Sequence, residues 1–130
     1  MAFLIHSMDD GHTLPIEYLP CDDITVKVGT VMKVSSGHLV KATTNSDLPE
    51  YLCLCDKTVT TDGDLIPVAK ISSHMILEAP LQAADSNVAI GAKIYLYSDG
   101  EQFGAVNSSG KGVIVGFTGK GAGDKVRVRY

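Results

Sequence analysis

The most reactive residues of this 130-residue chain are two cysteines that stand two positions apart, Cys53 and Cys55. Residues two apart on a β-strand face the same side, so both thiols could reach one metal ion. A structural zinc site normally has four ligands. The other cysteine and the histidines stand isolated, without ligand spacing, at Cys21, His6, His12, His38 and His74. We therefore interpret both cysteines as small apolar residues of a core strand, and we expect no metal and no cofactor.

A glycine-rich stretch, Gly119 to Asp124, has the composition of a phosphate-binding loop but not its spacing. Such a loop needs glycine where Ile114 stands and serine or threonine where Gly121 stands. It must also open a helix, whereas the residues that follow have the pattern of a strand. We expect a flexible connection between two strands, in which glycine supplies a positive φ angle.

The carboxylates do not form a catalytic pattern. Most aspartates stand at turns, as Asp62, Asp64, Asp99 and Asp124 do, and aspartate is favoured there because its side chain bonds the local backbone. No serine occupies a Gly-x-Ser-x-Gly elbow, and no histidine stands near a plausible nucleophile. The sequence therefore predicts a protein that is not an enzyme.

The composition is that of one folded domain that binds neither nucleic acid nor membrane. Hydrophobic residues make up 45% and charged residues 20%, and the net charge of -4 gives no reason to bind a phosphate backbone. Aromatic residues make up only 6%, so a sugar-stacking cavity is poorly supplied. No apolar run approaches the roughly 20 residues that span a bilayer. Three cysteines are an odd count for a disulfide framework, so we expect a soluble protein made in a reducing cytoplasm.

Short strands separated by Gly, Asp and Ser turns predict an all-β protein, a compact barrel or sandwich. Residues 24–34 alternate in polarity, and Ser35-Ser36-Gly37 predicts a hairpin turn before the return strand Leu39–Thr43. Pro67 lies inside a predicted strand, so that strand should run at an edge or carry a bulge. Only Ala79–Ser86 has a composition that favours a helix.

Landmarks of the last third of the chain also occur earlier, which predicts an internal twofold repeat of a hairpin plus two strands. The matched pairs are Val26–Gly29 with Val88–Gly91, Gly37 with Gly100, Ala42 with Ala105, Tyr51–Cys55 with Val113–Phe117, and Gly63–Val68 with Gly123–Val128. The repeat units cover about 24–71 and 86–130. Together they make a predicted β-barrel domain over 24–130.

Residues 1–23 lie outside the predicted repeat and combine apolar residues with Gly11, Pro15 and Pro20. We interpret this region as an extended N-terminal arm that packs along its own barrel or on another subunit. For residues 16–19, an ordinary strand of the protein's own sheet is an equal alternative. At the other end, Arg127 and Arg129 share one face of the final strand, either as a solvated face or as partners of carboxylates on a neighbouring subunit.

A set of short motifs runs in a fixed order along nearly the whole chain. These are Pro15-Ile16-Glu17-Tyr18-Leu19-Pro20, Val28-Gly29, Gly37-x-Leu39-Val40-Lys41-Ala42-Thr43, Gly63-Asp64-Leu65-Ile66-Pro67-Val68, Val88-x-Ile90-Gly91-x-Lys93-Ile94-Tyr95-Leu96 and Gly123-Asp124-Lys125-Val126-Arg127-Val128-Arg129. The order and spacing resemble small capsid decoration (head cement) proteins of tailed phages and prophages.

The resemblance implies a compact β-barrel without an active site, often a homotrimer, on the outer surface of the virion. It would be made in the bacterial cytoplasm, bind the major capsid protein and stabilise the shell by bridging neighbouring subunits. The arm would lie across a partner by strand addition, and a chain without residues 1–19 would still fold. The candidate interface residues are Phe3, Leu4, Ile5, Leu14, Ile16, Tyr18, Leu19, Arg127 and Arg129. The alternatives are a small-ligand or carbohydrate-binding β-barrel module and a tail or baseplate component.

Overall fold

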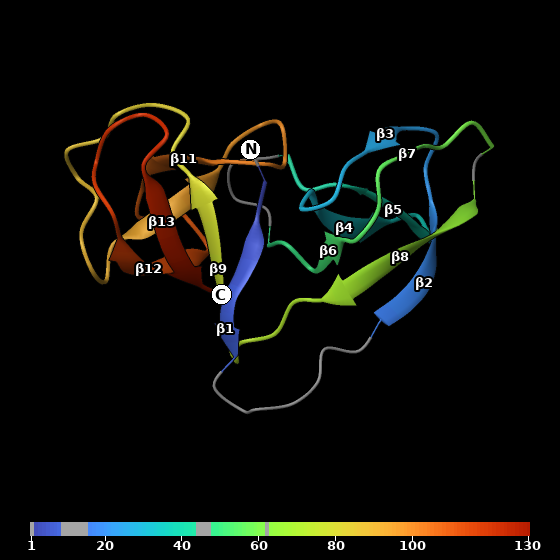
Figure 1. The fold of residues 1–130 in the computed structure, drawn as a ribbon, viewed down its shortest axis with the longest axis horizontal. Coiled ribbons are helices and arrows are strands. Elements are labelled where there is room, and N and C mark those ends of the chain that lie inside the picture. Colours follow the sequence, from blue (N-terminus) through green and yellow to red (C-terminus); the bar gives the residue numbers. More distant parts are fainter. Residues whose placement is uncertain (1, 9–15, 44–47, 62) are drawn as a thin grey trace.

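The computed structural model describes residues 2–8, 16–43, 48–61 and 63–130, and within these ranges the chain forms strands and turns but no helix. The expectation of an all-β protein is confirmed. Two lobes lie side by side (Figure 1). The N-terminal lobe holds β2 (Ile16–Cys21), β3 (Thr25–Val26), β4 (Val31–Ser35), β5 (His38–Lys41), β6 (Tyr51–Cys53), β7 (Lys57–Thr58) and β8 (Asp64–Lys70). The C-terminal lobe holds β1 (Leu4–Met8), β9 (Met75–Pro80), β10 (Lys93–Leu96), β11 (Phe103–Val106), β12 (Gly112–Phe117) and β13 (Lys125–Arg129).

In the N-terminal lobe, five strands pair in a closed ring in the order β2-β5-β4-β6-β8. The side chains of β8 alternate between the two faces of this ring. Ile66 and Val68 are buried in the core, whereas Leu65 is exposed on the other face. The predicted hairpin is β4–β5, and both central residues of its turn, Ser36 and Gly37, have positive φ angles of 51° and 82°. Such a turn matches the right-handed twist of the two strands.

The C-terminal lobe is a six-stranded sheet in the order β1-β9-β13-β12-β10-β11. Along β13, Val126 and Val128 are fully buried while Lys125 and Arg127 reach the surface, so the period of two fixes which face meets the core. An isolated parallel bridge joins Leu81 to Phe103. This bridge brings the end of β9 back to β11.

Five strands follow the same pairing order in both lobes, and one strand pair has the same register in both. The pairs Pro20–Leu65 and Tyr18–Pro67 of β2 and β8 recur as Pro80–Lys125 and Glu78–Arg127 of β9 and β13, each residue 60 positions later. Main-chain bonds recur as well. The amide of Gly63 donates to Cys21 O and the amide of Gly123 donates to Leu81 O, both at 2.9 Å.

The correspondence includes β2 and β9, which lie outside the repeat units expected at 24–71 and 86–130. It also includes the glycines of positive φ, all of which fall at landmarks matched in the sequence. These pairs are Gly29 with Gly91, Gly37 with Gly100, and Gly63 with Gly123. Positive φ at the same turns of both lobes explains why glycine stands at both members of each pair.

The lobes share a core in which the N-terminal segment takes part. The larger of two hydrophobic clusters combines residues of the C-terminal sheet with Val31, Ala42 and Leu52 of the N-terminal lobe. The Phe3 amide donates to Gly29 O, and the Val31 amide donates to Gly100 O, both at 2.9 Å. These bonds and the common cluster hold the two lobes against each other.

Three expectations differ from the structure. No helix forms over Ala79–Ser86, because Ala79 and Pro80 belong to β9, where Ala79 is buried and Pro80 pairs with Lys125. The strand expected over Tyr51–Cys55 ends at Cys53. Pro67 lies in a central strand between β6 and β2 rather than at an edge.

Pro67 is tolerated in β8 because of where its nitrogen points. Its carbonyl accepts from the Leu54 amide at 3.1 Å, one residue past the end of β6. The amide nitrogen and carbonyl of one strand residue point to the same side. The missing N–H of Pro67 therefore faces Leu54, just past the end of β6, and the pairing of Tyr51–Cys53 with β8 does not need it.

Candidate interaction surface

Phe3, expected at an interface, lies inside the molecule. Its side chain is 2% exposed and its ring meets that of Phe103 edge-to-face, with centroids 4.8 Å apart. A Cβ atom on Gly29 would come within 2.6 Å of Phe3 O, so the backbone also packs closely here. Phe3 therefore serves the core of this chain and is not free to contact a partner.

The other N-terminal candidates divide between core and surface. Leu4 is 46% exposed, while Ile5 is half-buried against the shared core of the two lobes. Leu19 is half-buried against the core of the N-terminal ring. Leu14 lies outside the described residues. Both described parts of the expected arm are strands of this chain: β1 pairs with β9 and β2 pairs with β8.

Ile16 and Tyr18 form the most exposed apolar site that the sequence predicted. Their side chains are 59% and 65% exposed. They share one face of β2. On β8, Pro67 pairs with Tyr18, and Leu65, which pairs with Pro20, lies on the same face. Leu65 is 58% exposed. We call Ile16, Tyr18, Leu65 and Pro67 the β2–β8 face.

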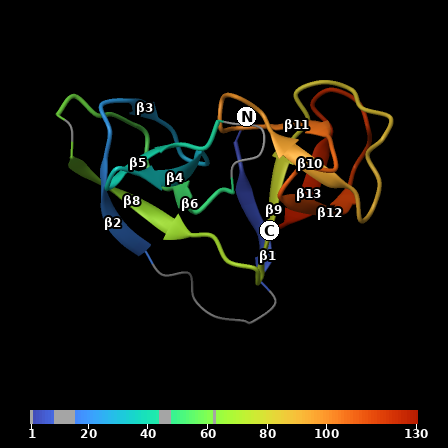
Figure 2. The ribbon, with the colours of Figure 1, turned by 180° about the vertical axis from the view of Figure 1, so that it is seen from behind.

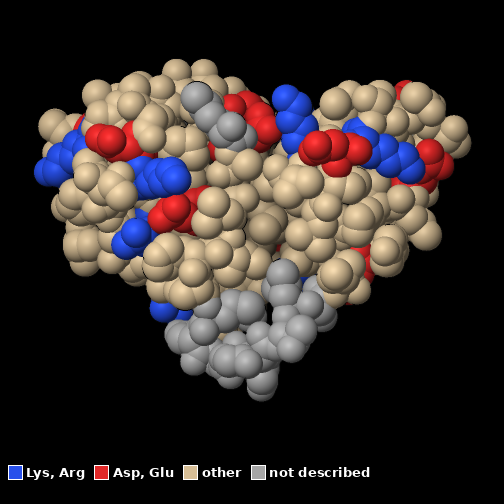
Figure 3. Space-filling model, viewed as in Figure 1, with Lys and Arg blue, Asp and Glu red and all other residues tan. Residues whose placement is uncertain are grey.

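The β2–β8 face carries no charged side chain on its outward positions. Figure 3 shows lysine, arginine, aspartate and glutamate over much of the C-terminal lobe and over the upper part of the N-terminal lobe, with few of them on the lower part of the N-terminal lobe. In the same view, β2 and β8 run along that lower part (Figure 1). An exposed apolar surface with charges around it is typical of a protein-binding site.

The two arginines of the last strand have partners within the chain. Arg127 Nε donates to Glu78 Oε2 at 2.9 Å, across the β9–β13 pair, and Glu78 is 8% exposed. Arg129 Nη1 donates to the carbonyl of Ser73 at 2.9 Å. The Arg127 guanidinium thus neutralises a nearly buried carboxylate of its own sheet.

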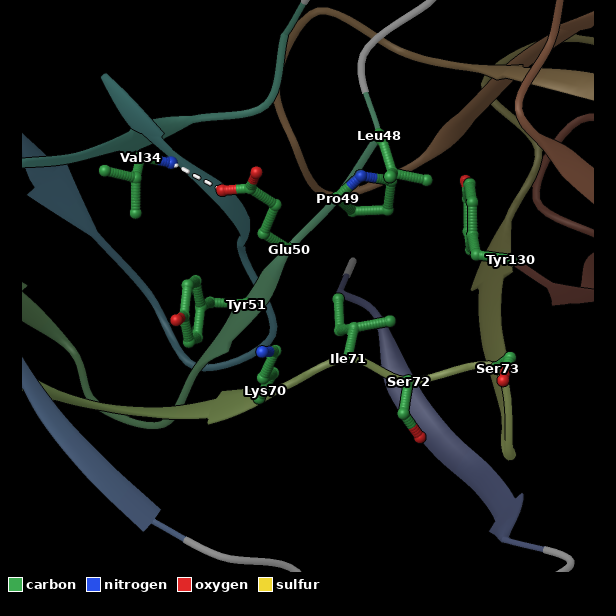
Figure 4. Close-up of a pocket in the computed structure, with 10 residues that line it drawn as sticks. All are labelled: Val34, Leu48, Pro49, Glu50, Tyr51, Lys70, Ile71, Ser72, Ser73 and Tyr130. Carbon is green, nitrogen blue, oxygen red and sulfur yellow. Dashed lines mark hydrogen bonds between the residues drawn. The ribbon is translucent and has the colours of Figure 1, made fainter. Parts of the chain in front are cut away.

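A half-open pocket of about 350 Å³ lies where the two lobes meet (Figure 4). Its walls are mainly apolar and come from Val34, Leu48, Pro49, Tyr51, Ile71 and Tyr130, with Glu50, Lys70, Ser72 and Ser73 as polar lining. The Glu50 carboxylate accepts from the Val34 amide at 2.9 Å. The Tyr130 hydroxyl is buried without a hydrogen-bond partner among the described residues, and burial raises its pKa above the usual range.

The cysteine pair behaves as apolar core residues. Cys53 is fully buried, and its thiol donates to Cys55 O at 3.3 Å. Burial raises the pKa of the Cys53 thiol to about 11. Within the ranges that the structure describes, no group of three or more histidine, cysteine or acidic residues is placed to hold a metal ion.

The glycine-rich stretch joins β12 to β13 and folds around one carboxylate. Asp124 Oδ2 accepts from the Gly121 amide at 2.8 Å. A Cβ atom on Gly119 would clash with the same carboxylate oxygen. Gly123 has a φ of +83°. The stretch is a connection between strands, as the sequence predicted, closed by its own aspartate.

The sequence pointed to Ile16 and Tyr18 as interface candidates but not to Leu65 on the neighbouring strand β8. Leu65 was placed on a strand without a functional role, because its exposure depends on which face of β8 meets the core. The pairing of Pro20 with Leu65 shows which face of β8 Leu65 occupies. One feature of the sequence relates to this pairing: the spacing between Gly63-Asp64 and Gly123-Asp124 equals the spacing between Pro20 and Pro80.

No protein-family model matches the chain, and a search of curated proteins gives no significant match. Among the described residues, no helix is long and apolar enough to cross a bilayer.

Proposed function

We propose that this protein is a structural virion protein, without catalytic activity, that binds the outer surface of a tailed-phage capsid. It stabilises the shell by bridging neighbouring major capsid subunits, as a trimer on the capsid surface. The β2–β8 face is the observation that carries the proposal, because three large apolar side chains stand more than half exposed on adjacent strands. The order of sequence motifs, which resembles capsid decoration proteins, supports the same partner.

The size of the face sets what it can contribute. Covering the exposed parts of Ile16, Tyr18 and Leu65 removes on the order of 300 Å² from water, or about 7 kcal/mol before the costs of association. A stable interface buries roughly 1,200–2,000 Å² in total. The β2–β8 face is therefore the centre of a larger contact, which several protomers bound to a repeating shell surface would extend.

We also propose that the lobes descend from one duplicated unit, each a small β-barrel. The equal register of β2–β8 and β9–β13 and the paired glycines support this origin.

Co-sedimentation with empty, expanded shells of a major capsid protein tests the proposed function. We expect saturable binding at a fixed ratio to capsid subunits. Ile16→Asp should weaken binding about tenfold or more, because it places a charge within the β2–β8 face. Ile90→Asp is the matched control, since Ile90 is 65% exposed on the C-terminal lobe. The absence of saturable binding by the native protein would refute the proposal.

The pocket between the lobes favours a second candidate, a small-ligand or carbohydrate-binding module. Its volume of about 350 Å³ is within the range of ligand sites, and Tyr51 and Tyr130 line it. A thermal-shift screen with mono- and disaccharides tests this function. A stabilisation that Tyr51→Ala abolishes would favour it over shell binding.

A further inference from the structure

One edge of β2 lacks the strand that its counterpart carries. In the C-terminal lobe, β1 pairs antiparallel along β9, with Leu4 opposite Glu78 and Ile5 opposite Leu77. In the N-terminal lobe, β2 pairs along its length with β8 and meets β5 only through Cys21 and Leu39. No described strand occupies the position beside residues 16–19 that β1 takes beside β9 (Figure 2).

The hydrogen bonds at the end of β2 show in which direction its main-chain groups point. Cys21 O accepts from the Gly63 amide, so Cys21 points its main chain toward β8. Alternate residues of a strand point the same way, so Glu17 and Leu19 also face β8. Ile16 and Tyr18 then turn their N–H and C=O groups to the opposite, open edge. Asp22 alternates with Cys21 in the same way as Ile16 and Tyr18 do. Its amide donates to Leu39 O, on the side away from β8, which supports this assignment.

In the other lobe, where β1 lies on one side of β9 and β13 on the other, the corresponding side chains are less exposed. Tyr18 is 65% exposed, whereas its counterpart Glu78 is 8% exposed. Ile16 is 59% exposed, and its counterpart Ile76 is half-buried. The open edge of β2 therefore combines main-chain groups that pair with no described strand and apolar side chains that are more exposed than their counterparts on β9.

We propose that the Ile16–Leu19 edge of β2 receives an extended segment of a partner protein by antiparallel strand addition, as β9 receives β1. Main-chain hydrogen bonds to Ile16 and Tyr18 would hold the segment. Its side chains toward the β2–β8 face would be uncharged, since that face offers no charge to pair with. The identity of this partner as a capsid subunit rests on the proposed function, but the strand addition itself does not.

A second copy of this chain is a poorer occupant. The strand of the chain that would fit, β1, is already paired with its own β9. Two β2 edges pairing with each other would join only four residues from each copy. Such a contact buries far less surface than the roughly 1,200 Å² that a stable dimer buries. The partner must therefore supply the strand from a body that makes further contacts, as a subunit of an assembled shell would.

Hydrogen exchange at single amides tests the proposal, first on shells. The protein is bound to expanded shells, exposed to deuterium, released and read by NMR. We expect the Ile16 and Tyr18 amides to exchange about tenfold more slowly, or slower still, than in the free protein. The amides of Glu17 and Leu19, which face β8, are the internal control and should change little. If the protein sediments with shells but the Ile16 and Tyr18 amides exchange as fast as in the free protein, strand addition is overturned and the proposed function stands.

A second arm of the experiment uses free protein and a synthetic peptide of residues 2–8, Ala-Phe-Leu-Ile-His-Ser-Met, at millimolar concentration. If the protein does not bind shells, the proposed function fails, and this arm alone decides the inference. Slower exchange at Ile16 and Tyr18 with peptide supports it, and unchanged exchange overturns it. Protection that grows with protein concentration alone, together with a doubled mass, would also overturn it by identifying a second copy as the occupant.

A proline variant separates main-chain pairing from side-chain contact. Tyr18→Pro removes the N–H that faces the open edge but no bond to β8, and we expect about tenfold weaker binding to shells. Tyr18→Thr keeps the N–H and should lose less. Retained protection at Glu17 and Leu19 shows that the proline variant folds. Should it not fold, the exchange of the native protein still decides the question.

Discussion

Replacing Phe3 by alanine should destabilise the whole protein, although Phe3 is the third residue of the chain. Its ring is buried and packs edge-to-face on Phe103. A Phe→Ala change at a buried site costs about 3–5 kcal/mol, because apolar contacts are lost and a cavity remains. Domains of this size are stable by roughly 5–15 kcal/mol, so the loss is a large share of the total.

Part of that loss should be specific to the aromatic pair. Edge-to-face rings contribute about 0.5–1.5 kcal/mol beyond their buried area. A double-mutant cycle with Phe3→Leu and Phe103→Leu should give a coupling energy of this size, since leucine retains most of the apolar volume. The cycle therefore distinguishes the ring contact from general burial.

Urea unfolding followed by far-ultraviolet circular dichroism measures these changes. Leu4→Ala is the control, because Leu4 is 46% exposed and neighbours Phe3 on the chain. We expect it to lower the free energy of unfolding by less than about 1 kcal/mol. If Phe3→Ala costs no more than Leu4→Ala, the N-terminal segment does not belong to the core and the reasoning is refuted.

Three further predictions concern the backbone, an ion pair and a thiol. Gly29→Ala should lower the free energy of unfolding, measured by urea unfolding, by at least about 2 kcal/mol more than Gly37→Ala. Both glycines have a positive φ, but only at Gly29 would the added Cβ atom strike other atoms, those of Ala2 and Phe3. Equal losses would contradict the close packing. Arg127→Met should cost about 1–3 kcal/mol in urea unfolding, because Glu78 loses the partner of its nearly buried carboxylate; a neutral outcome would show that the pair contributes nothing. Burial raises the Cys53 pKa from 9.0 to about 11, so the native state holds this proton more tightly than the unfolded chain. The free energy of unfolding should fall as pH rises from about 9 toward 11, and this fall should shrink in Cys53→Ala.

The local elements of the fold were predictable because the signals that set them are local. The β4–β5 hairpin follows from alternation on both sides of Ser36-Gly37, whose φ angles are both positive. The described glycines that the sequence pairs at turns all have positive φ angles. Tertiary pairing decided the segments that were missed. Ala79 and Pro80 have the composition of a helix start, but pairing with β13 places them in a strand.

The candidate surface was only partly predictable, because exposure depends on which strand covers which. Phe3, Leu4, Ile16 and Tyr18 look alike in the sequence as apolar residues of one N-terminal region. The fold places Phe3 in the shared core, where it bonds Gly29 of the N-terminal lobe and packs on Phe103 of the C-terminal lobe, and it leaves Tyr18 exposed on β2. Nothing in the local sequence distinguishes these two environments.

This difference determines how the N-terminal region can be tested. A deletion of residues 1–19, which the expectation of a separate arm suggests, would remove Phe3 from the shared core and most of β2 from the N-terminal ring. Loss of shell binding in that variant would report unfolding as well as loss of contact. Substitutions on the exposed side chains Ile16, Tyr18 and Leu65 leave both cores intact, because none of the three belongs to either cluster. These substitutions, rather than truncation, separate the binding role of the N-terminal region from its part in the fold.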